Sequence, residues 1–157
     1  MDLIEISSAV VWVDFITIAL HKFFNLGRSL DKWYSMFGIV AVISDCLVII
    51  LGIVLANIIL PNASLFMLVA LSIVIQLMHD YLFYIFIILR IPSGHNSMID
   101  LFKEYANENS WKILVADSMM IGSSVIIADW FSDMKKGVTS FIGLLGAYAL
   151  TYIIYTK

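Results

Sequence analysis

The sequence predicts an all-α integral membrane protein, a helical bundle of four or five transmembrane helices. Hydrophobic residues make up 62% of the 157 positions, and charged residues make up only 13%. The mean hydropathy is +0.98. A soluble domain of this size needs far more charge to cover its surface. We therefore expect the whole chain, residues 1–157, to form a single transmembrane domain.

Five apolar segments provide the predicted helices, and they cover residues 8–24, 34–60, 63–91, 111–131 and 138–155. The last four are long enough to cross a bilayer, which takes roughly 20 residues. The first is shorter, and we expect it either to cross as a short span or to lie in the membrane interface. Only the connections at 25–33 and 92–110 have any length, so no extramembrane domain is predicted.

The distribution of Lys and Arg predicts the orientation of the bundle. If all five segments cross, seven basic residues fall on one side and two fall on the other. The richer side should be cytoplasmic, which places the N-terminus outside and the C-terminus inside. The seven residues are Lys22, Arg28, Lys32, Arg90, Lys103, Lys112 and Lys157, and the two are Lys135 and Lys136.

Ionisable residues interrupt the first four apolar segments. Counted from the predicted cytoplasmic ends at ~1.5 Å of rise per residue, they fall at similar depths in the cytoplasmic half of the membrane. A charged acid that faces lipid near mid-span costs at least ~2.5 kcal/mol. We therefore expect these residues to face inward, to pair with one another and to share protons or a bound cation. The predicted intramembrane polar layer consists of Asp14, Asp45, His79, Asp80 and Asp117.

Small residues at helical spacing predict the faces through which the helices pack. In the second segment they share a stripe with the acid, and in the fifth they recur every four residues. Small side chains let a neighbouring helix approach closely. The predicted packing residues are Gly38, Ala41, Gly52 and Ala56 in the second segment and Gly143 and Ala147 in the fifth.

The longer cytoplasmic connection contains a predicted amphipathic helix. Turn residues end the third segment, after which Ser97 is expected to cap a helix, with Asp100 in the capping-box position. We expect this helix to lie on the membrane surface or on a partner protein. Its predicted contact residues are Met98, Phe102, Lys103 and Tyr105.

Motifs of known sites are absent from the sequence. Glu-x-x-His and His-x-x-x-His pairs, which place metal ligands on one helix face, do not occur. Neither do a potassium-filter sequence, a nucleophile motif or a phosphate-binding loop. We therefore expect no metal, no cofactor, no catalytic residue and no nucleic-acid partner, and we do not expect an enzyme.

The third and fourth segments and the connection between them resemble a known group of proteins. The runs are HDYLFY (79–84), PSGHNSMIDLFKEYA (92–106) and ILVADS (113–118), within a region of about a third of the chain. They resemble small multi-pass membrane proteins that large DNA viruses of algae and protists encode. The resemblance implies no activity, but it implies a viral setting, such as the lipid layer beneath an icosahedral capsid.

Two functions fit these observations. The first is a structural or scaffolding membrane protein of a viral internal membrane, whose partners are the bilayer, capsid or other membrane proteins and further copies of the chain. The second is a proton or cation channel or transporter that uses the intramembrane acids and His79. The viral resemblance and the lack of a recognisable filter motif favour the first.

Overall fold

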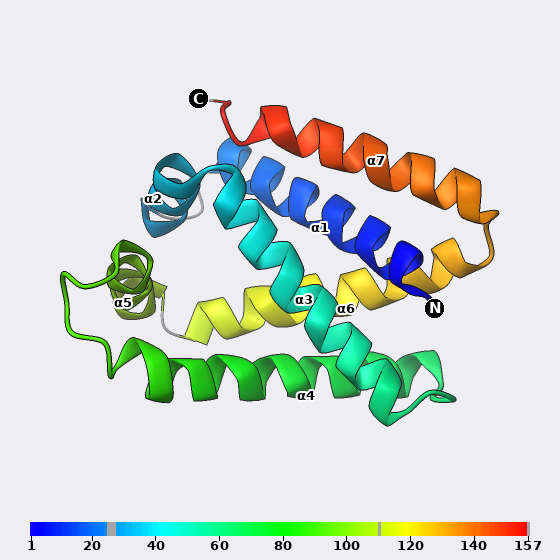
Figure 1. Cartoon of the computed structure of the whole chain (residues 1–157), viewed down its shortest axis with the longest axis horizontal. Coiled ribbons are helices and arrows are strands. Elements are labelled where there is room, and N and C mark those ends of the chain that lie inside the picture. Colours follow the sequence, from blue (N-terminus) through cyan, green and yellow to red (C-terminus); the bar gives the residue numbers. More distant parts are fainter. Residues whose placement is uncertain (25–27, 110, 157) are drawn as a thin grey trace.

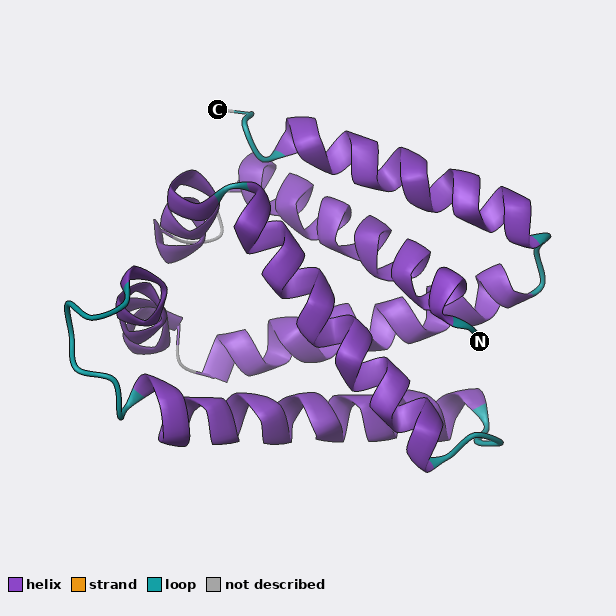
Figure 2. Cartoon of the chain, in the orientation of Figure 1, coloured by secondary structure: helices purple, strands orange, loops and turns teal. Residues whose placement is uncertain are grey.

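The computed structural model describes residues 1–24, 28–109 and 111–156, and every regular element in this part of the chain is a helix (Figure 1). Figure 2 shows the same arrangement coloured by element type. The predicted all-α bundle is thus confirmed. Four helices are long and apolar enough to cross a membrane, as an integral membrane protein requires. They are α1 (Leu3–Phe24), α3 (Ile39–Ile59), α4 (Leu65–Phe83) with its π-helical continuation η1 (Tyr84–Ile88), and α6 (Trp111–Ser132).

The first span begins earlier than the sequence predicted. The Asp2 carboxylate accepts hydrogen bonds from the backbone N–H groups of Ile4, at 3.0 Å, and Glu5, at 3.1 Å, and so caps the helix. An acid at this position also interacts favourably with the helix dipole. The polar first turn concealed the true start, and α1 is a full 22-residue helix rather than a borderline one.

The second predicted segment is two helices rather than one. α2 (Arg28–Phe37) is a separate ten-residue helix, and α3 starts after it at Ile39. Gly38 lies between them with a φ of 50°, a left-handed conformation that glycine adopts without a steric penalty. Gly38 is therefore the junction of two helices, and a Cβ atom added there would lie 3.3 Å from the Tyr155 hydroxyl oxygen, so the position also permits a close contact. Of the other predicted packing residues in α3, Ala41, Gly52 and Ala56 are buried.

The two ends of the bundle differ in what covers them. α1, η1 and α7 (Lys136–Ile153) finish, and α3 and α6 start, at the end where α2 and α5 (Ser97–Asn109) lie (Figure 1). The opposite end carries only the α3–α4 and α6–α7 turns and the N-terminus. Six of the seven basic residues that were predicted to share one side lie at the end with α2 and α5. The seventh, Lys157, is outside the described residues. The short helices α2 and α5 therefore form a cap on one end.

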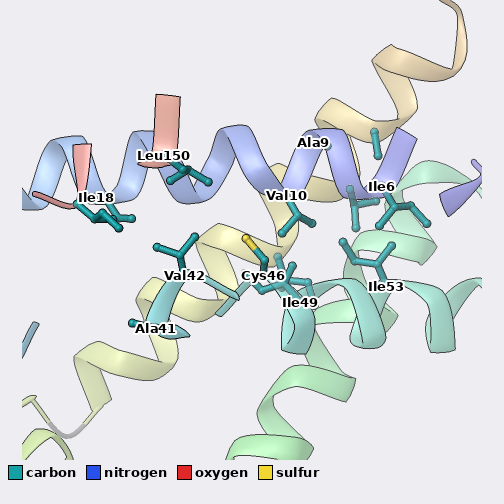
Figure 3. Packing of buried hydrophobic residues seen from close by; sticks show 14 of the residues in the cluster. Ile6, Ala9, Val10, Ile18, Ala41, Val42, Cys46, Ile49, Ile53 and Leu150 are labelled. Carbon is teal, nitrogen blue, oxygen red and sulfur yellow. The ribbon is translucent and has the colours of Figure 1, made fainter. Parts of the chain in front are cut away.

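The core is built around α1. This helix contacts α3, α6 and α7, and apolar side chains of α1, α3 and α7 meet along it (Figure 3). Large apolar residues on the outer faces are exposed, as they are on a surface that faces lipid. Because lipid tails are as apolar as these side chains, close packing and interhelical hydrogen bonds hold such a bundle together. The labelled core residues are Ile6, Ala9, Val10, Ile18, Ala41, Val42, Cys46, Ile49, Ile53 and Leu150.

α7 docks on α1 through glycine. A Cβ atom added at Gly143 would lie 2.2 Å from Ser8 Oγ, and one at Gly146 would lie 3.0 Å from Trp12 Nε1. The Ser8 hydroxyl donates to the Thr139 carbonyl at 3.2 Å, and Trp12 Nε1–H donates to the Ile142 carbonyl at 2.9 Å. These contacts hold two helices at opposite ends of the sequence in close register.

Ala147 is exposed, so the predicted four-residue stripe of α7 has the wrong rotation. The buried positions alternate between spacings of four and three residues: Thr139, Gly143, Gly146 and Leu150, of which Gly143 is partly buried. α7 itself is only 18 residues long and includes Lys136 and several Ser, Thr and Tyr residues. It is not among the four helices that are apolar enough, as well as long enough, to cross a membrane.

Gly143→Ala should destabilise the bundle by roughly 1–3 kcal/mol, the usual cost of overpacking a close contact. Thermal unfolding in detergent measures the effect. The matched control is Gly137→Ala in the same helix, where an added Cβ meets no atom within 4 Å. That change should be neutral or slightly stabilising, because alanine favours helix by ~1 kcal/mol over glycine. Equal unfolding temperatures for the two variants would contradict the α1–α7 docking.

Candidate functional site: a carboxylate cluster beneath α2 and α5

The four predicted acids come from four different helices that pack against one another. The Asp14 carboxylate of α1 lies 3.7 Å from the thiol of Cys46, the residue after Asp45 in α3, and Asp80 and Asp117 belong to the packed pair α4 and α6. We call these four residues the carboxylate cluster. Among the ion pairs of the described residues, none joins a cluster member to Lys or Arg.

Two aromatic donors from α2 bind the Asp45 carboxylate. Trp33 Nε1–H donates to Asp45 Oδ2 at 2.9 Å, and the Tyr34 hydroxyl donates to the same oxygen at 3.4 Å. Both aromatic side chains are buried. They share the apolar face of α2 with Phe37, and the left-handed turn at Gly38 folds that face back over the start of α3. Neutral donors can thus satisfy an acid without adding a positive charge.

His21 is a functional candidate that the sequence analysis missed. Its side chain is 1% exposed, and Nε2 lies 2.9 Å from Asp31 Oδ1 of α2. Its ring centre is 6.2 Å from that of Tyr34. In the sequence, His21 follows Asp14 by seven residues. Residues about two turns apart lie on the same face of a helix, so this spacing indicates that His21 shares the face of Asp14. His21 lies close to the end of its segment, where a charged residue suggests a connecting loop instead.

His79 lies at the outer edge of the polar layer, where it pairs with Asp80. Its side chain is 47% exposed, and its ring stacks on Phe83 at 5.7 Å. It reaches the cluster only at the edge, where Nδ1 lies 3.1 Å from Asp80 Oδ1. The same oxygen accepts a 2.9 Å hydrogen bond from Gln76 Nε2–H, one turn earlier in α4. Gln76 is the buried neighbour of Asp80, and His79 is the outer one.

The apolar face of α5 packs on the bundle. Phe102 contacts the Trp33 ring at 4.9 Å and the Phe83 ring at 6.0 Å. Met98 packs against the core cluster, and Tyr105 is partly buried near Asp117. The predicted contact residues Met98, Phe102 and Tyr105 thus make contacts within the chain itself.

Polar contacts fix the ends and sides of α5. Lys103 Nζ donates to the Ile91 carbonyl at 2.6 Å, and an ion pair between Lys32 and Glu104 joins α2 to α5. The helix cap is Asn96 rather than Ser97, because Asn96 Oδ1 accepts from the backbone N–H of Met98 at 2.9 Å. The pair of short helices therefore covers the carboxylate cluster as one unit.

The hydroxyl groups beside the cluster remain protonated donors. Burial raises the pKa of Tyr34 well above 10.0, and the negative charges of Asp45 and Asp14 add to the effect. Burial and the charges of Asp117 and Asp45 likewise raise the pKa of Tyr105. A tyrosinate here would be both desolvated and repelled.

Several buried polar atoms around the cluster lack a hydrogen-bond partner within the described chain. Each such atom costs about 1–3 kcal/mol if it stays unpaired, so groups of this kind mark places where a proton, water or ion can bind. No group of three or more His, Cys, Asp or Glu residues that could hold a metal ion occurs among the described residues. The unpartnered atoms include Asp14 Oδ1, His21 Nδ1, Ser72 Oγ, Gln76 Oε1 and Asp80 Oδ2.

The fold and the site together define the class: an all-helical membrane bundle with an internal, capped carboxylate cluster. Comparisons with protein-family models, with curated proteins and with solved structures find no match for this chain. The function must therefore be inferred from the chemistry of the cluster itself.

Tyr34→Phe should reduce the loss of stability at alkaline pH. The pKa of Tyr34 is raised from 10.0 in the folded state. The contribution of its protonated hydroxyl to the free energy of unfolding is therefore complete below pH 10.0 and falls as the pH rises above that value. Unfolding temperatures in detergent between roughly pH 8 and 11 measure the slope that this ionisation produces. The control is Tyr81→Phe, which removes an exposed side-chain hydroxyl. A slope that is identical in wild type and Tyr34→Phe would show that this hydroxyl is not buried.

Proposed function

We propose that the protein is a membrane channel or transporter in which the carboxylate cluster binds and releases protons or small cations. The observation that carries the proposal is the set of four neighbouring carboxylates from four helices, none paired with Lys or Arg in the described chain. Ionisable groups inside a membrane are costly, and in membrane proteins they mark ion pathways and proton relays. Acids without a basic partner are suited to exchange a positive charge.

The cap formed by α2 and α5 fits such a function. It covers the cluster at one end of the bundle and contributes neutral donors, Trp33 and Tyr34, directly to Asp45. Gly38, with its φ of 50°, connects this cap to the span below it. Movement of α2 would expose Asp45 to the aqueous side, so that the cap would act as the gate of the pathway.

A scaffolding protein is the second candidate, and the hydrogen bonds of Asp45 favour it. These bonds join α2 to α3, as expected if the acid only sets helix packing. In that case the charged outer faces of α2 and α5 would bind capsid or other membrane proteins, or another copy of the chain, in a viral internal membrane. We rank it second because the α5 face that was expected to bind a partner is packed within the bundle.

We further propose that the capped end is cytoplasmic, since most Lys and Arg residues lie there. Single cysteines at Ser93 and Ser132, in a Cys46→Ser background, test this orientation. Both positions are exposed, one after η1 and one at the end of α6. An impermeant thiol reagent added outside should label only position 132. Labelling of position 93 instead would reverse the orientation.

Asp45→Asn and Asp80→Asn should abolish ion flux in proteoliposomes while the helical bundle remains folded. Asparagine keeps nearly the shape of a protonated aspartate but cannot exchange a proton. The assay measures H⁺, Na⁺ and K⁺ flux separately. The control, Asp129→Asn, changes an exposed acid near the opposite end of α6 and should leave the flux intact. Absence of any flux in the wild type would reject transport and leave scaffolding.

A further inference from the structure

One face of α4 carries three polar side chains that extend from the carboxylate cluster into the bundle. Ser72, Gln76 and Asp80 recur every four residues, and each has a buried oxygen with no hydrogen-bond partner in the described structure. Ser72 is 0% exposed, and Gln76 is 4% exposed. The row is therefore enclosed by protein along most of its length.

The row lies where α3, α4 and α6 meet. A Cβ atom on Gly52 of α3 would lie 3.8 Å from Gln76 Oε1 and 3.1 Å from Ile121 Cδ1 of α6. Ser124 of α6 is also fully buried, and its hydroxyl donates to the Met120 carbonyl at 2.8 Å. Gly52 thus lets Ile121 pack closely against the α3 backbone beside the Gln76 amide, in a contact that is otherwise apolar.

The spacing of the row matches water better than a metal ion. The side chains of Gln76 and Asp80 bond directly, with Nε2–H donating to Oδ1 at 2.9 Å, and Gln76 Oε1 and Asp80 Oδ2 are the atoms left for water. Between Gln76 and Ser72, four helical residues rise ~6 Å, and one water that makes two hydrogen bonds of ~2.8 Å spans nearly that distance. A hard cation such as calcium needs at least about six oxygens, each ~2.4 Å away. Three oxygens spread over ~12 Å of helix cannot surround one ion.

We propose that ordered water molecules bridge Asp80, Gln76 and Ser72, and that this chain conducts protons between the cluster and the opposite half of the bundle. The inference rests on the proposed transport function and specifies the transported ion as H⁺. In each step the O–H bond of the donor breaks as an O–H bond forms on the next oxygen, so one proton moves and no other charge is created. The Ser72 hydroxyl both donates and accepts, whereas the Gln76 carbonyl accepts only and holds its water in place.

Gln76→Leu and Ser72→Ala test the water chain in proteoliposomes. Each removes one buried polar group, and Ser72→Ala changes the volume little. Each should lower H⁺ flux by at least roughly tenfold, the effect of a barrier raised by ~1.4 kcal/mol, with Na⁺ and K⁺ flux absent throughout. Ser118→Ala is the control, because its hydroxyl bonds to its own helix at Leu114, 2.6 Å away. Wild-type H⁺ flux that neither variant changes, or flux of Na⁺ or K⁺, would overturn the proton chain and leave the transport proposal standing.

Infrared difference spectra separate this inference from the proposed function. Internal waters give O–H stretching bands that shift in water labelled with heavy oxygen. We expect such bands in the wild type and in Ser118→Ala, and their loss in Gln76→Leu. Bands that persist in Gln76→Leu, or that are absent from the wild type, would overturn the water chain. Bands that behave as expected in a wild type without any flux would uphold the bound waters and reject transport.

Discussion

Carboxylates that are withdrawn from water need donors, and a lipid bilayer supplies none. In this protein the donors come from the chain itself, and their placement accounts for much of the architecture. Trp33 and Tyr34 reach Asp45 only because α2 folds back at Gly38, and Gln76 reaches Asp80 from the preceding turn of α4. Cys46 supplies a weak thiol contact to the otherwise enclosed Asp14, at 3.7 Å. The need to satisfy Asp45 with neutral donors therefore accounts for the position of α2 over the start of α3.

The sequence was most informative about the acids and least informative about helix rotation. Four aspartates at matched depth predict a shared layer, and the structure places them on four helices that pack against one another. Rotation was harder because the outward face of a membrane helix is as apolar as its inward face, so the usual amphipathic pattern is nearly lost. This is why Ala147 was placed on the packing face although Gly146 is the buried residue. The same ambiguity hides the fact that His21 is buried while His79 is partly exposed.

For the short helices α2 and α5, the sequence does not predict what their apolar faces contact. The patterns of α2 and α5 do show one apolar face each, but a pattern cannot say whether that face meets lipid, a partner or the same chain. Phe102 was therefore expected on a surface and instead packs between Trp33 and Phe83. The break at Gly38 depends on a backbone angle, and a glycine inside an apolar run gives no warning of it.

The docking of α7 on α1 has a consequence for biosynthesis. The hydrogen bonds of Ser8 and Trp12 join residues 131 and 130 positions apart in the chain. At a translation rate of about 5–20 residues per second, their acceptors are made on the order of ten seconds after the donors. During that interval α1 must remain in the membrane, or beside the insertion machinery, without its final partner. Slower or prematurely terminated translation would prolong the lifetime of an intermediate in which the glycine-docking face of α1 is open to other helices.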